Sequence, residues 1–233
     1  VAGATPAGAI LSSVYDTNAG LGDENSVESQ GASATVQIDL NDHWTFKSIT
    51  AWREGETTTV IDFDNTPAAT LDIPGFYADD QFTQEFQFQF DYDRIQGVAG
   101  FFYLDGHAEG AFDTILANAG IVIGTNGQVN TESWAGFADV NLDLNDRLHL
   151  GLGVRYTLDE KVGTVFRANY LGATRSPLLG GTVRAPLLVR SNYTNDNDFS
   201  QFTPRIALSY DLTDDMTTYA SFSQGFKSGG FDM

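Results

Sequence analysis

Polar and apolar residues alternate with a period of two along most of this chain. In residues 82–92 the odd positions are all polar, and the even positions are aromatic except for Gln84. Residues 148–159 repeat the pattern, with Leu, Val or Tyr at every even position. Successive side chains of a β-strand point to opposite faces, so this period predicts strands and not helices.

Short polar turns at 40–44, 91–95, 144–148 and 212–216 join these alternating segments in pairs. Between the turns the chain makes longer excursions, roughly through 65–80, 113–128 and 167–198. Tight turns on one side and long connections on the other are typical of a transmembrane β-barrel. The pattern predicts about eight strands, at 28–40, 44–63, 81–92, 95–111, 129–144, 148–166, 199–212 and 216–231.

A soluble antiparallel sandwich is the alternative, because its strands also alternate. The expected strands are too long for it: they run roughly 11–17 residues, against ~5–6 in globular sheets and the ~9–11 that cross a bilayer. Aromatic residues near strand ends, among them Trp44 and Trp134, also match the girdles that such barrels place at membrane interfaces. We therefore predict an all-β fold, an antiparallel meander of long transmembrane strands.

The composition is strongly acidic, with 31 Asp and Glu against 12 Lys and Arg and a net charge of −19. This balance argues against nucleic acid as a partner, because phosphate binding needs a basic surface. There is no Cys, hence no disulfide framework and no thiolate metal site. No apolar run approaches the ~20 residues of a membrane helix.

The chain begins at Val1, without an initiator Met or a secretory signal, and ends at Met233. We therefore expect a piece of a longer protein. Residues 1–27 are interpreted as an extracellular loop or an incomplete N-terminal segment. Residues 28–233 are interpreted as a β-barrel segment of about eight strands.

Residues 161–195 invert the local charge, because they contain five basic residues and no Asp or Glu. As an extracellular loop, this segment is a candidate for capturing an anionic ligand, since Arg makes planar charge-assisted contacts. The alternatives are a plain solvated loop, or Arg side chains that hold lipopolysaccharide phosphates. The candidate ligand-binding residues are Arg167, Tyr170, Arg175, Arg184, Arg190 and Tyr193.

Other polar clusters have weaker signals. The acidic residues around 65–80 and the run 195–198 offer the oxygen ligands that Ca²⁺ takes, without the spacing of a dedicated loop. Asp105, His107 and Glu109 share one strand face, which is expected to face water inside a barrel. No catalytic motif occurs, so no enzyme is predicted. The acidic candidates of the first group are Asp62, Asp64, Asn65, Asp72, Asp79 and Asp80.

Residues 202–231 resemble the mid-barrel of TonB-dependent outer-membrane receptors. They run from a strand with Pro204-Arg205, through the turn Thr213-Asp214-Asp215, to a strand of the pattern Tyr-Ala-Ser-x-Ser-x-Gly-Phe-Lys-x-Gly-Gly-Phe at 219–231. Residues 150–157 are similar to the preceding hairpin of that family. The ordered motifs span 150–231, and the weaker hairpin pattern extends back to residue 28.

The resemblance implies part of a large outer-membrane β-barrel of roughly 22 strands, plugged by an N-terminal domain. It implies a receptor in the outer membrane of a Gram-negative bacterium that imports a scarce nutrient, most often a ferric siderophore, and needs no cofactor. The implied partners are the TonB complex, through an N-terminal segment absent from this sequence, the small-molecule ligand, and outer-membrane lipid with lipopolysaccharide. The alternative is a small complete barrel with a structural, adhesive or passive-pore role.

Overall fold

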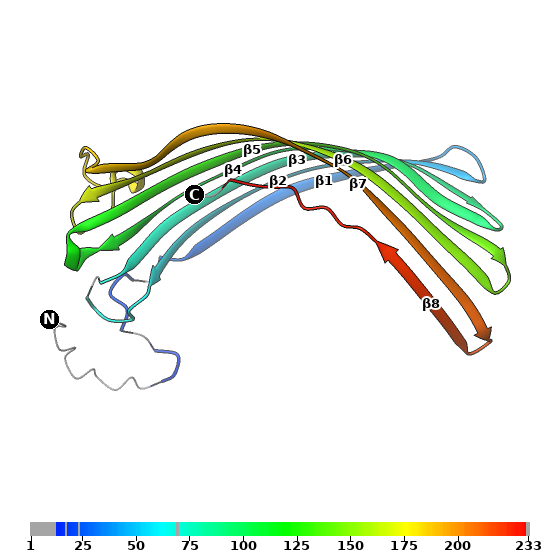
Figure 1. Cartoon of the computed structure of the whole chain (residues 1–233), viewed down its shortest axis with the longest axis horizontal. Coiled ribbons are helices and arrows are strands. Elements are labelled where there is room, and N and C mark those ends of the chain that lie inside the picture. The colour runs from blue at the N-terminus through cyan, green and yellow to red at the C-terminus, as the bar shows by residue number, and fades with distance from the viewer. Residues whose placement is uncertain (1–12, 17, 23, 69, 232–233) are drawn as a thin grey trace.

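The computed structural model describes residues 13–16, 18–22, 24–68 and 70–231. It contains one eight-stranded sheet whose strand order follows the sequence (Figure 1). The strands are β1 (Ser26–Asp39), β2 (Trp44–Asp62), β3 (Asp72–Tyr92), β4 (Ile95–Leu116), β5 (Ile121–Asn145), β6 (Leu148–Leu171), β7 (Leu188–Thr213) and β8 (Met216–Ser223). Two short 3₁₀ turns, η1 (Ala117–Ala119) and η2 (Pro177–Leu179), interrupt the connections. No helix in these ranges is long and apolar enough to cross a membrane.

Every strand pairs antiparallel with the next one, as the hairpin rhythm predicts. All four polar turns lie at one end of the sheet, here called the turn end, at the right of Figure 1. The remaining connections lie at the opposite end, here called the loop end. The predicted all-β meander and its strand number are therefore confirmed.

The strands extend further at the loop end than their polarity pattern indicates. The expected excursion 113–128 is wrong, because β4 and β5 continue into it and leave only η1 and Gly120, whose φ is 62°. The expected excursions 65–80 and 167–198 shrink to 63–71 and 172–187. Backbone pairing does not require an apolar face, so polar and small residues continue the ladder where the alternation fades.

The register joins the apolar positions of all strands into one continuous face. One row of direct partners runs through Phe90, Gly97, Val140, Leu152 and Ile206. We call this side the apolar face and the opposite side the polar face. The predicted apolar set of Phe86, Phe88, Phe90, Leu150, Leu152, Val154, Ile206 and Leu208 shares the apolar face, and Glu85, Gln87, Asp143, Arg155 and Arg205 share the polar face.

The sheet curls around its polar face. Trp134 on the apolar face is 39% exposed, whereas its neighbour Ala135 on the polar face is 2% exposed. The same contrast separates Tyr156, at 53%, from Thr157, at 8%. A sheet that is enclosed on its polar side and open on its aromatic side has the sidedness of a barrel wall.

Two glycines explain why the alternation is blurred in β4. A Cβ at Gly97 would lie 2.7 Å from the Cζ atom of Phe90, and a Cβ at Gly100 would lie 2.5 Å from that of Phe137. Each glycine therefore provides the space for a neighbouring aromatic ring. The alternation therefore lacks a side chain at one position on the apolar face, Gly97, and at one on the polar face, Gly100, without the strand losing its packing.

The C-terminal segment departs from the predicted strand 216–231. β8 ends at Ser223, and residues 224–231 cross the polar face instead. There the Nζ atom of Lys161 donates a hydrogen bond of 3.0 Å to the carbonyl oxygen of Gly229. At the other end of the chain, β1 takes in residues 26–27 of the expected N-terminal loop, while residues 1–12 lie outside the described residues. The interpretation of 1–27 otherwise stays a prediction.

Candidate functional site

The connection between β6 and β7, residues 172–187, folds back over the apolar-face side of the sheet at the loop end. The main-chain N–H of Ser176 donates a hydrogen bond of 2.6 Å to Oδ2 of Asp113, which points to the same side as Phe101. Ser176 and Leu178 also lie against Gly124, the direct partner of Asp113. The connection encloses a small core of Ala111, Asp113, Ile115, Val122, Ala168, Tyr170 and Ser176, each at most 4% exposed.

Two of the candidate ligand-binding residues hold this connection in place. Tyr170 is buried in the small core, and the guanidinium of Arg184 lies 5.9 Å from the centre of its ring. Arg184 also donates hydrogen bonds to the carbonyl oxygens of Thr174 and Arg175, at 3.1 and 3.2 Å. Both side chains therefore have structural contacts on the apolar-face side.

Arg175 and Arg190 lie at the rim. Arg175 forms an exposed ion pair of 3.2 Å with Glu24. Arg190 is an extra residue in β7, because its neighbours pair directly with β6 and leave it in a bulge. The Nε atom of Arg190 donates to Oδ1 of Asn169 at 3.0 Å.

Arg167 and Tyr193 lie on the polar face. They belong to neighbouring strands, since Arg167 pairs with Ser191 and Tyr193 pairs with Val165. Among the described residues, Nε of Arg167 is buried without a hydrogen-bond partner. The expected single loop 161–195 is thus wrong in extent: it consists largely of strand, and its candidate residues divide between two faces of the sheet.

Burial determines the electrostatics of the small core. It raises the pKa of the Asp113 carboxyl above its ordinary value, while the hydrogen bond from Ser176 and the charges of Arg184 and Arg175 act in the opposite direction. Burial also raises the pKa of the Tyr170 hydroxyl, with a further contribution from Asp113. The connection therefore covers an acid that is more readily protonated than a free one.

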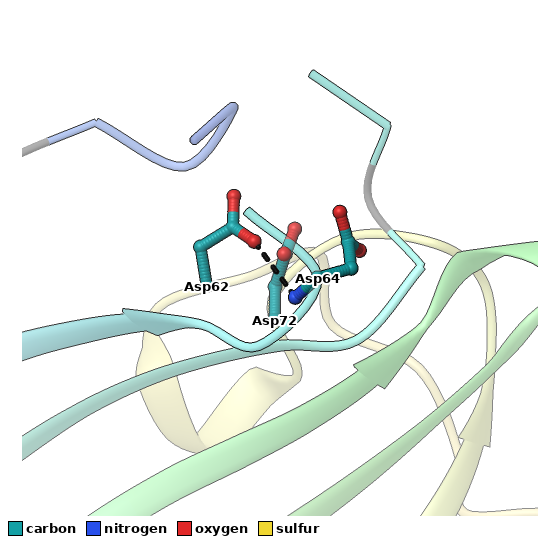
Figure 2. Close-up of side chains that lie close together, drawn as sticks. All are labelled: Asp62, Asp64 and Asp72. Carbon is teal, nitrogen blue, oxygen red and sulfur yellow. Dashed lines mark hydrogen bonds between the residues drawn. The ribbon is translucent and has the colours of Figure 1, made fainter. Parts of the chain in front are cut away.

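Three of the acidic candidates converge beside the connection between β2 and β3, residues 63–71. Asp62, Asp64 and Asp72 each offer one carboxylate oxygen, and these atoms lie within 4.8 Å of one another (Figure 2). Oδ1 of Asp62 accepts hydrogen bonds from the main-chain N–H groups of Asp64 and Asn65, at 3.1 and 2.8 Å. We call Asp62, Asp64 and Asp72 the Asp cluster.

The members of the Asp cluster differ in their surroundings. Hydrogen bonds led by the Thr66 hydroxyl lower the pKa of Asp64. Asp72 is only 4% exposed, and burial followed by the charges of Asp62 and Asp64 raises its pKa. The other acidic candidates lie elsewhere: Asp79 pairs with Arg53 at 3.5 Å, and residues 195–198 belong to β7 and not to a loop.

A row of directly opposed acids crosses four strands on the apolar-face side. Asp105 pairs with Glu132, Glu132 with Glu160, and Glu160 with Asp198. We call these four residues the acidic row. Sequence reasoning missed it, because only the register between strands brings the four residues together.

The expected orientation of Asp105, His107 and Glu109 toward water inside a barrel is wrong. Asp105 shares the face of Phe101, so the three residues point to the apolar-face side. Nδ1 of His107 lies 2.6 Å from Oδ1 of Asn130 on the next strand. This contact connects His107 in β4 to Asn130 in β5.

Comparisons with known proteins agree with this architecture. The family model described as TonB dependent receptor-like, beta-barrel matches residues 2–233. No curated protein sequence matches the chain.

Solved structures share the fold at low sequence identity. The ferric yersiniabactin uptake receptor FyuA from Yersinia pestis is 18% identical with a TM-score of 0.65, over 85% of this chain and 29% of that protein. The siderophore receptor PiuA from Acinetobacter baumannii is 14% identical with a TM-score of 0.60, over 86% of this chain and 33% of that protein. This chain thus spans about a third of the length of the solved receptors that it matches.

Proposed function

We propose an active transport function in the outer membrane for this chain, which belongs to the TonB-dependent receptor-like β-barrel family. The observation that carries the proposal is the eight-stranded two-faced sheet over which the family model matches. In this proposal the chain supplies part of the wall of an importer in a Gram-negative bacterium. The polar face lines the interior, and the apolar face meets lipid.

The strand lengths support this placement. β2 to β7 contain 19 to 26 residues, whereas ~9–11 residues cross a bilayer. The aromatic and aliphatic rows begin at the turn end, so the membrane band lies there and the loop ends extend beyond the outer leaflet. The small core and the Asp cluster then lie outside the hydrocarbon, on the extracellular side.

The proposed substrate is a ferric siderophore, because FyuA is named as a ferric yersiniabactin uptake receptor and PiuA as a siderophore receptor. Arg167 and Tyr193 are the best placed of the candidate residues, because they lie on the polar face at the loop end. A guanidinium there favours an anionic ligand through charge-assisted hydrogen bonds. Arg175 and Arg190 contribute charge at the rim, and Tyr170 and Arg184 support the connection beside it.

Lipid and lipopolysaccharide are the proposed partners of the outer surface. Arg175 lies on the membrane-facing side of the rim and is the candidate for contact with lipopolysaccharide phosphates. The acidic row lies on the same side and repels phosphates, so this contact is expected to be confined to the rim. The TonB complex is the proposed energy source, acting on an N-terminal segment of the full-length receptor.

Uptake of radioactive iron by whole cells tests the proposal. Cells that lack the gene are compared with cells that carry it on a plasmid, under iron limitation and with a panel of ferric siderophores. Accumulation that needs the gene and stops when an uncoupler dissipates the proton gradient is the expected result. Entry that persists with the uncoupler would instead identify a passive pore.

A further inference from the structure

We propose that the Asp cluster binds a Ca²⁺ ion at the loop end of the sheet. Asp62 ends β2, Asp72 begins β3, and Asp64 lies in the connection between them. Their ligand oxygens lie within 4.8 Å of one another, which is about twice the 2.3–2.6 Å of a Ca²⁺–oxygen bond. One ion can therefore lie among the three carboxylates without a rearrangement of the backbone.

The second observation is the state of the Asp72 side chain. Asp72 is 4% exposed, and within the described ranges its Oδ1 atom has no hydrogen-bond partner. Its carboxylate lies between those of Asp62 and Asp64, as Figure 2 shows. Buried polar atoms are almost always paired, so an unpaired carboxylate oxygen beside two further carboxylates points to a cation as its partner.

The carboxylates on either side of Asp72 are oriented by hydrogen bonds, and that of Asp62 still has a free coordination site. Asp62 accepts hydrogen bonds from Gly20, Asp64 and Asn65, and Oδ2 of Asp64 accepts from the N–H groups of Thr70 and Leu71. A carboxylate has about four lone-pair sites, so the three donors on Asp62 leave one site for a metal. Oδ1 of Asp64 also accepts from the main-chain N–H and the hydroxyl of Thr66, so Asp64 supplies negative charge beside the ion and not a free site. The donors fix where the oxygens point, as they do around built metal sites.

The donor set selects Ca²⁺ over other common ions. The cluster contains only carboxylates, without the His or Cys ligands that Zn²⁺ prefers. Mg²⁺ demands near-ideal octahedral geometry and gives up its water reluctantly, whereas Ca²⁺ accepts irregular sets of 6–8 oxygens. Partly buried carboxylates completed by water, in a chain with a net charge of −19, therefore suit Ca²⁺.

The ion would connect three parts of the rim. Oδ2 of Asp62 holds the main-chain N–H of Gly20 at 2.8 Å, which ties the segment before β1 to the cluster. Asp72 pairs with Ile115 near the end of β4. Neutralising the three carboxylates removes their mutual repulsion, so binding stiffens the connection 63–71 against the sheet.

Calorimetric titration of the full-length protein tests the site. The protein is purified in detergent, stripped with EDTA and titrated with CaCl₂. We expect one site with a dissociation constant of roughly 0.1–1 mM, the range of extracellular Ca²⁺ modules. Asp72→Asn keeps the shape of the side chain and is expected to weaken binding at least tenfold. Asp80→Asn, which removes one exposed charge from the middle of β3, is the matched control and should bind like the wild type.

A second variant and a second ion complete the test. Asp64→Asn should weaken Ca²⁺ binding as Asp72→Asn does, and each variant must retain the wild-type far-ultraviolet circular dichroism spectrum. Unchanged Ca²⁺ affinity in both folded variants, or an equal loss in Asp80→Asn, overturns the site. Equally tight binding of MgCl₂ overturns the assignment to Ca²⁺.

Discussion

The main-chain N–H of Ser176 donates a hydrogen bond to the carboxylate of Asp113, although 63 residues separate the two in the sequence. Both residues are completely buried. The bond fixes the connection 172–187 to the sheet, and Arg184 reinforces it by its contact with the ring of Tyr170. A segment that the sequence predicts as a basic loop is therefore a packed part of the rim.

Replacing Asp113 by Ala should loosen this connection. The substitution leaves the buried N–H of Ser176 without an acceptor, at a cost of about 1–3 kcal/mol, or a roughly 5- to 150-fold increase in local opening. Asp113→Asn keeps a carbonyl acceptor and serves as the control. Hydrogen exchange of the Ser176 amide measures the opening, and equal protection in the Ala and Asn variants would show that the bond contributes nothing.

Docking of the connection should also depend on pH. Burial raises the pKa of Asp113 above its ordinary 3.8, so the docked state binds a proton more readily than the undocked state. The stability that this proton adds to the docked state is fully present below about pH 3.8. It is lost as the pH rises through the raised pKa of Asp113. The distribution of distances between a spin label at Val183 and one on β4 should therefore broaden as the pH rises. In the Asp113→Asn variant this distribution should no longer depend on pH.

The hairpins and the two faces were predictable from the sequence, because they depend on local properties. Polar turns such as 144–148 mark hairpin ends, and the alternation in 148–159 identifies the face of each side chain. A lipid-facing surface enforces that alternation within the bilayer. Beyond the bilayer the constraint disappears, which is why β5 starts at Ile121 and not near residue 129.

The candidate sites were less predictable, because they depend on contacts between strands. The charge inversion in 161–195 is visible in the sequence, yet it does not indicate that Arg184 packs over Tyr170 while Arg167 lies on the opposite face. The acidic candidates around 65–80 include all three members of the Asp cluster. Which of them converge follows only from the pairing of Asp62 with Asp72.

Removing one negative charge from the acidic row should stabilise the sheet. Glu160 directly opposes both Glu132 and Asp198, and opposed like charges destabilise a cross-strand pair by about 0.2–1 kcal/mol. Glu160→Gln is therefore expected to raise the midpoint of urea unfolding, with a smaller gain in high salt, where screening already weakens the repulsion. Asp93→Asn, in a turn, is the control, and an equal gain there would attribute the effect to net charge alone.

A charge on the apolar face should impair the barrel, whereas one on the polar face should not. Leu152→Lys places an ammonium group in the lipid-facing band, where it costs about 2–4 kcal/mol at the bilayer midplane. Ser209→Lys places the same group on the polar face, near Asp143 and Asp211. Heat-modifiable electrophoretic mobility of the full-length protein measures folding. Equal folding of both variants would contradict the assignment of the two faces.

Arg167 should contribute to ligand capture more than Arg175, although both are Arg residues of the same charge-inverted segment. Arg167 lies on the polar face, whereas Arg175 lies outside and already pairs with Glu24. A charged hydrogen bond lost from a desolvated site removes about 1.5–3 kcal/mol, so Arg167→Gln should raise the half-saturating siderophore concentration roughly 10- to 150-fold. Arg175→Gln should leave it near the wild-type value.

Salt dependence separates electrostatic capture by Arg167 from a packing role. Exposed charges are screened beyond ~8 Å at physiological ionic strength, so wild-type affinity should fall as salt rises. The Arg167→Gln receptor has lost the attracting charge, and its affinity should change less with salt. Whole-cell uptake at two ionic strengths measures both effects. If Arg167→Gln and Arg175→Gln take up the ligand equally well at low salt, Arg167 has no part in capture, and the ligand contacts must come from other residues of the receptor interior.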